Sequence, residues 1–165
     1  MSADRPSDAQ MRDANVNPET GLATDYLNLF NEATMLFELA LDMPGMAQEL
    51  HGWKRKTYVE HFEHSGFARR DVVIAAYYAA PSETRARFDG LCEQVCDSFS
   101  EAISGFVASD LDDGTSVHEA RETLDELKHL VSLLDAEIHG RMPTLAEGRL
   151  DGGSDIDQAA IDALF

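Results

Sequence analysis

The sequence lacks long hydrophobic runs and has few cations. No stretch of about 18 or more apolar residues occurs, so no segment is expected to enter a membrane. Met1 to Asn17 is polar and acidic without an apolar core, which predicts no signal peptide and a cytoplasmic protein. Lys and Arg number 13 against 31 Asp and Glu, a net charge of −18. This balance argues against nucleic acid and anionic membranes as partners and favours a basic patch on a protein.

Cysteine is equally scarce, because Cys92 and Cys96 are the only two. Their spacing of four places both thiols on one face of a predicted helix, where a disulfide has poor geometry. We expect reduced thiols in a core rather than a metal or redox site.

Metal-ligand spacing is sparse. One predicted helix carries a group of residues that could bind a metal: Glu60, His61, Glu63 and His64. A di-iron bundle needs Glu-x-x-His on two helices, and only Glu126 and His129 have that spacing. We therefore expect no metal and no cofactor.

One basic run, Trp53-Lys54-Arg55-Lys56, interrupts the acidic sequence. A Trp beside three cations could stack on and pair with a nucleotide. The alternative is a solvated helix start that faces nearby carboxylates.

The first half of the chain predicts helices after a disordered start at 1–16. Asn17-Pro18-Glu19 has the N-cap, first-turn proline and acid of a helix start, although Thr24-Asp25 is an alternative. The densely apolar segment from Tyr26 to Met43 predicts a helix buried on most of its surface. Thr57 and Glu60 have capping-box spacing, and residues 68–80 predict a helix over a strand by their length and alanines.

The second half predicts two long helices. The first begins at Ser82 and reaches about Ser109, and a capping box at Ser116 and Glu119 opens the second. A heptad seam then runs through Val117, Ala120, Leu124, Leu127, Val131, Leu134 and Ile138. Gly140 and Pro143 end it. The short connection predicts an antiparallel hairpin, so we expect an all-α bundle built on this hairpin, packed against the N-terminal half or against a second subunit as a homodimer.

Residues 17–140 thus form the predicted helical domain, and 141–154 a flexible linker. Residues 155–165 then form an amphipathic helix capped by Asp157, too short to be stable alone. We expect it to fold in a basic groove of a partner. The expected partner-binding residues are Ile156, Asp157, Gln158, Ile161, Asp162, Leu164 and Phe165.

This run resembles the docking peptide of the flagellar switch protein FliM family, with the pattern Ser-Gln-x-Glu/Asp-Ile-Asp-Ala-Leu. The matching residues are Gln158, Ile161, Asp162, Ala163 and Leu164, whereas Asp157 replaces the Ser and Ala160 the acidic residue. It also resembles the acidic tail of the chemotaxis phosphatase CheZ family, which ends in a Leu/Phe cluster. Both families bind the response regulator CheY, so the resemblance implies a CheY-like receiver domain as partner. The alternative is a terminal helix that docks on its own domain.

The phosphatase resemblance also implies a helix-borne glutamine that orients water on an aspartyl phosphate, with an acid four residues earlier. Gln94 lies in the middle of the hairpin, but Gly90 stands where the acid belongs. Asn28, one turn after Asp25, is a second candidate that is similar to the amide of other chemotaxis phosphatases. Because both surrounding motifs are missing, we expect a regulatory adaptor of chemotaxis or two-component signalling rather than an enzyme. A phosphatase of the receiver and a structural helical oligomer without a receiver partner are the alternatives.

Overall fold

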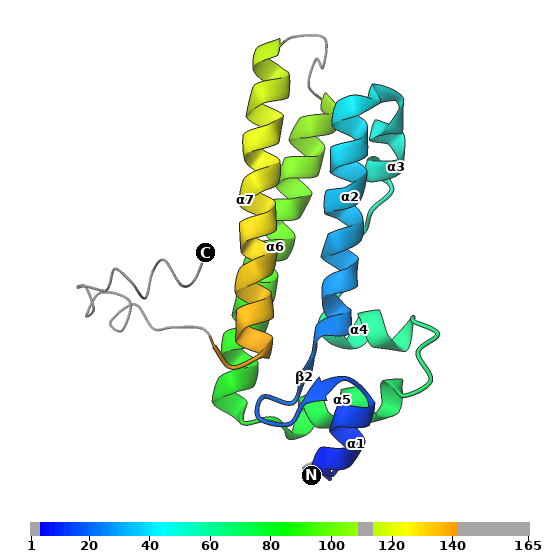
Figure 1. The fold of residues 1–165 in the computed structure, drawn as a ribbon, viewed down its shortest axis with the longest axis vertical. Coiled ribbons are helices and arrows are strands. Elements are labelled where there is room, and N and C mark those ends of the chain that lie inside the picture. The colour runs from blue at the N-terminus through cyan, green and yellow to red at the C-terminus, as the bar shows by residue number, and fades with distance from the viewer. Residues whose placement is uncertain (1–3, 109–113, 142–165) are drawn as a thin grey trace, which may run out of the picture.

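The computed structural model describes residues 4–108 and 114–141, and these fold mainly into helices (Figure 1). The helices are α1 (Asp8–Asp13), α2 (Asn28–Asp42), α3 (Ala47–His51), α4 (Tyr58–Glu63), α5 (Arg70–Ala79), α6 (Ser82–Ala108) and α7 (Gly114–Ile138). Two 3-10 turns, η1 (Thr24–Leu27) and η2 (Pro44–Met46), lead into α2 and α3. Strands β1 (Val16–Asn17) and β2 (Leu22–Ala23) form a small antiparallel hairpin. The all-α prediction is confirmed.

The three long helices α2, α6 and α7 lie side by side, and α6 and α7 run in opposite directions (Figure 1). The predicted seam of α7 faces the core. Its buried members are Ala120, Leu124, Leu127, Leu134 and Ile138, with Val117 and Val131 partly buried against them. In the described ranges, every helix is too short or too polar to cross a membrane.

Aromatic side chains join α2 to α6. The ring centroids of Phe30 and Phe99 lie 5.2 Å apart, and those of Phe37 and Phe106 lie 4.4 Å apart. Tyr26 of η1, just before α2, packs edge-on against Tyr58 of α4, with the ring centroids 5.3 Å apart. Such large side chains remove much apolar surface from water, so they fix the spacing between the long helices.

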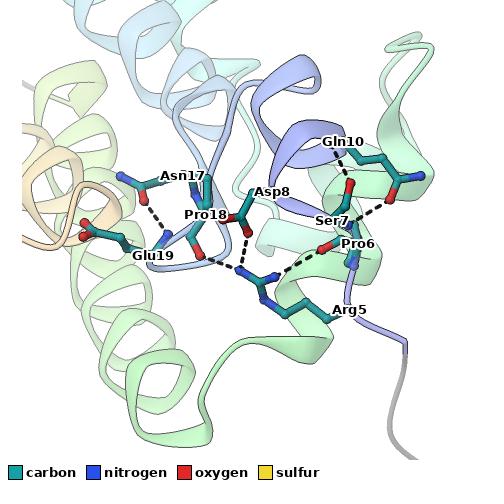
Figure 2. A network of polar contacts seen from close by, with 8 residues as sticks. All are labelled: Arg5, Pro6, Ser7, Asp8, Gln10, Asn17, Pro18 and Glu19. Atoms are coloured by element: carbon teal, nitrogen blue, oxygen red, sulfur yellow. Dashed lines mark hydrogen bonds and ion pairs between the residues drawn. The ribbon is translucent and has the colours of Figure 1, made fainter.

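Residues 4–16 differ from the prediction of disorder at 1–16. Ser7 caps α1 with a complete capping box. Its hydroxyl accepts from the backbone N–H of Gln10, and the side-chain oxygen of Gln10 accepts from the backbone N–H of Ser7 (Figure 2). Arg5 also donates to Asp8 and to the Pro18 carbonyl, at 3.0 and 2.9 Å. Met11 is fully buried. The segment is therefore ordered by one buried apolar anchor and by local caps.

The predicted helix start at Asn17 is also wrong. Its side chain does accept from the Glu19 amide, as an N-cap would, at 2.8 Å (Figure 2). However, the chain turns back instead, and Asn17 pairs with Leu22 across the hairpin. The same side-chain hydrogen bond serves a turn as well as a helix, which explains the error. The alternative start at Thr24 coincides with η1.

Gly21 fixes how the hairpin packs on α5. Its φ of +75° is a conformation that favours glycine, and a Cβ there would lie 2.9 Å from the Ala76 carbonyl oxygen. The Thr20 hydroxyl donates to the carbonyl of Ile138 at 2.6 Å. The hairpin therefore contacts the end of α7 through Thr20 and packs on α5 through Gly21.

The helix ends follow the predicted chemistry in most places. The Thr57–Glu60 capping box is formed. At the end of α7 the Gly140 amide donates to Glu137 and the Arg141 amide to Ala136, with Gly140 at a φ of +71°. This is a Schellman motif, as Gly140 predicted. The start of α7 differs, because the helix begins at Gly114 and already includes the predicted cap residue Ser116.

Candidate functional site

The predicted docking peptide lies outside the described residues. Its residues, Ile156, Asp157, Gln158, Ile161, Asp162, Leu164 and Phe165, all belong to the range 142–165. The peptide therefore stays a prediction, and the described domain contributes the body that would carry it.

The two candidate catalytic amides lie on different elements. Gln94 is exposed on α6, and Asn28 is exposed at the first turn of α2. The carboxylates on either side of Gln94 have other partners. Asp89 accepts the Tyr77 hydroxyl with both oxygens at 2.8 Å, and Glu93 pairs with Arg55 at 2.7 Å. Both acids nearest Gln94 thus take part in contacts that join α6 to other elements.

A recess of about 440 Å³ opens beside these residues, between α4, α5 and α6. Tyrosines and thiols form its inner wall: Tyr26, Tyr58, Tyr77, Cys92 and Cys96. Arg55, Lys56, Thr57, Glu60 and Glu93 line its mouth. The recess thus combines a neutral aromatic interior with a rim of both charges.

The phenol and thiol groups in the interior of this recess are held neutral. Burial raises the pKa of the Cys92 thiol far above its usual range, and the neighbouring Cys96 thiol adds to the effect. Burial likewise raises the pKa of Tyr26 and of Tyr58. Since a thiolate rather than a thiol is the nucleophile, burial makes both cysteines poor nucleophiles and suits them to packing. This agrees with the prediction of buried, reduced thiols.

The basic run supplies a structural bridge. Arg55 donates to Glu93 and Asp97 of α6, each at 2.7 Å. The indole N–H of Trp53 donates to the Leu29 carbonyl at 2.8 Å, and its ring packs on Phe99. The Trp53 side chain is therefore half-buried against the core. Of the two interpretations of the basic run, contact with nearby carboxylates agrees with the structure. The run is not itself a helix start, because α4 begins only after Thr57.

The residues considered as metal ligands serve the packing of α4. Glu60 completes the capping box with Thr57, and His61 packs edge-on against Tyr26 at 5.6 Å. Within residues 4–108 and 114–141, no group of three His, Cys, Asp or Glu side chains has metal-binding geometry.

Comparison of the chain with protein-family models, with curated proteins and with solved structures finds no match.

The recess carries residues that the sequence did not single out. The contact between Tyr77 and Asp89 joins two helices across the turn at Pro81, and no local spacing rule relates them. The sequence shows the charge of Arg55 and its distance along the chain from α6. It does not predict the two acidic partners of Arg55, because these depend on how the loop after α3 packs.

Proposed function

We propose that this protein is a regulatory adaptor that binds a CheY-like receiver domain of bacterial chemotaxis or two-component signalling through residues 155–165. The observation that carries the proposal is the sequence match at Gln158, Ile161, Asp162, Ala163 and Leu164. The peptide has no Lys or Arg, so its groove on the receiver is rimmed by basic residues.

The described domain supports an adaptor role in two ways. Its core is built from buried side chains between Met11 and Ile138, so a folded body precedes the peptide. In addition, the groups nearest Gln94 are engaged in structural contacts, which favours binding over catalysis.

The test is a titration of purified receiver domains with the full chain, followed by calorimetry or fluorescence anisotropy. A short segment that folds on binding gives a dissociation constant of about micromolar order. Ile161→Ala and Leu164→Ala should each weaken binding by about 1–3 kcal/mol, as central apolar anchors do. Asp162→Asn should act mainly on the association rate and its salt dependence.

The matched control is a full-length chain in which residues 155–165 are scrambled, because it keeps composition and charge. Equal binding by the scrambled and native chains would refute the peptide as the docking element. Catalytic acceleration of receiver dephosphorylation, lost in Gln94→Ala, would replace the adaptor by the phosphatase. Absence of binding to every cognate receiver would leave the structural oligomer.

A further inference from the structure

A groove between α6 and α7 shares no lining residue with the recess. It has a volume of about 820 Å³ and follows the halves of these helices nearest residues 109–113. Its floor is apolar, with Phe37, Phe106 and Leu127 at the bottom and Ala102 and Leu130 on the walls. Phe37 and Leu127 belong to the core, so the groove reaches down to the centre of the bundle.

Both walls have the periodicity of a helix-packing surface. On α7 the lining residues include Ser116, Glu119, Thr123, Glu126 and Leu130, spaced alternately three and four apart. This is a second seam on α7, beside the one that faces the core, and from Ser116 to Leu130 it is about 21 Å long. Its length and its period fit a guest helix of about two heptads.

Part of the α6 wall is made of small side chains. Ser98, Ala102 and Gly105 lie one helical turn apart there, beside Glu101 and Phe106. Gly105 is exposed, and a Cβ added there would meet nothing within 4 Å. A glycine inside a helix lowers stability, and packing within the described domain does not require this one. Its absent side chain leaves room for another backbone to approach.

Charge decides what kind of helix fits. Glu101, Glu119, Asp125 and Glu126 line the groove, and no Lys or Arg does so among the described residues. The cations of α7 point elsewhere, because Arg121 pairs with Asp42 and Lys128 with Glu38, both of α2. Thus Arg121 and Lys128 of α7 face α2, and the carboxylates that line the groove form no ion pair with any other described residue.

We propose that the α6/α7 groove is a docking surface for a cationic amphipathic helix of a partner protein. The helix lays its apolar face against Phe106 and Leu130 and places its Lys or Arg beside Glu119 and Glu126. A second copy of this chain would bring carboxylates against carboxylates, and the tail 155–165 has no cation at all. The proposal is independent of the receiver-binding function.

The probe is a synthetic 18-residue Leu/Lys peptide with helical amphipathic spacing, titrated against the full chain. Two control peptides accompany it: a scrambled one of identical composition, and one with Glu in place of every Lys. The amphipathic cationic peptide should bind, and both controls should bind at least tenfold more weakly. Glu119→Gln with Glu126→Gln should weaken binding about tenfold, whereas Glu32→Gln with Glu63→Gln, on exposed residues outside the groove lining, should not.

The deciding variant is Gly105→Leu, which fills the groove from a position with open space. Gly90→Leu is its matched control, since Gly90 lies on the same helix, is also exposed with nothing within 4 Å, and does not line the groove. Both variants should fold. Gly105→Leu should lower peptide affinity at least tenfold, and Gly90→Leu should leave it unchanged.

The remaining outcomes separate the other occupants. Equal loss of affinity in the two glycine variants, or none in either, indicates unspecific attraction to an acidic protein and overturns the proposal. A wild-type dimer that Gly105→Leu dissociates assigns the groove to a second copy and also overturns it. Tighter peptide binding after scrambling of residues 155–165 assigns it to the chain's own tail. Receiver binding should be unaffected by Gly105→Leu, so failure here and failure of the adaptor function are distinguishable.

Discussion

At the scale of single residues, Gly21 shows how backbone conformation and a close contact can require the same amino acid. Its φ of +75° and the 2.9 Å approach of a virtual Cβ to the Ala76 carbonyl oxygen both exclude a side chain. Gly21→Ala should therefore lower the free energy of unfolding by about 2 kcal/mol in urea denaturation. Gly66→Ala is the control, because a Cβ at Gly66 meets nothing within 4 Å. Equal stability of the two variants would mean that the hairpin does not pack on α5 as described.

His61 gives the protein a defined response to acid. Burial lowers its pKa, and the nearby Lys56 adds to the shift. The unfolded chain takes up this proton near pH 6.5, and the folded protein does so only at lower pH. Between these two values the unfolded state binds more protons, so stability rises with pH and reaches its full value above about 6.5.

The measurement is the urea midpoint between pH 5 and 7. His61→Gln should flatten the rise in this window, while His118→Gln, at an exposed position on α7, should leave it unchanged. An identical slope in wild type and His61→Gln would show that another group is responsible.

At the scale of elements, the α7 seam carries the bundle. Leu127 is 2% exposed and lies mid-seam, so Leu127→Ala should cost about 2–5 kcal/mol in unfolding free energy. Val131→Ala, at a half-buried position of the same seam, should cost less. Leu127→Asp should unfold the domain, and a soluble Leu127→Asp protein of unchanged stability would contradict the seam.

The elements that could be predicted from sequence are those with long periodic patterns or explicit caps. The seam from Val117 to Ile138, the cap at Thr57 and the glycine end at Gly140 were all legible because each depends on residues within a few positions. The segment around α1 was missed although Ser7 and Gln10 have capping-box spacing. With only Met11 as a large apolar residue in that helix, there is no periodicity to weigh.

The candidate sites could be predicted from the sequence less well than the fold. The recess depends on Tyr77 meeting Asp89 across a turn and on Arg55 reaching α6, which are tertiary contacts. The sequence does contain a pattern at the groove, because the second seam through Glu119, Thr123 and Glu126 has helical spacing. Polar residues at this spacing read as a solvated face until the neighbouring wall of small residues is known.

At the scale of the whole molecule, charge is distributed unevenly. The cations of α7 bind α2, and Arg55 ties the loop before α4 to α6. These pairs are largely exposed, so each adds little stability. Many carboxylates have no cation to pair with, since the net charge is −18. The folded state therefore stores a like-charge repulsion that the expanded chain relieves.

Added salt should consequently stabilise this protein. The screening length falls from about 30 Å at 0.01 M to about 10 Å at 0.1 M, which removes repulsion between distant carboxylates. The thermal midpoint should rise by about 2–8 °C over this range, or about 1–2 kcal/mol for a domain of this size. The rise should be the same in NaCl and KCl and level off above about 0.3 M, because screening depends on ionic strength and not on the cation.

Glu101→Gln, Glu119→Gln and Glu126→Gln together should raise the low-salt midpoint and shrink the salt response, since they remove neighbouring charges from one groove. A midpoint that falls as NaCl is added would show instead that the exposed ion pairs, and not the excess of carboxylates, dominate the electrostatics of the fold.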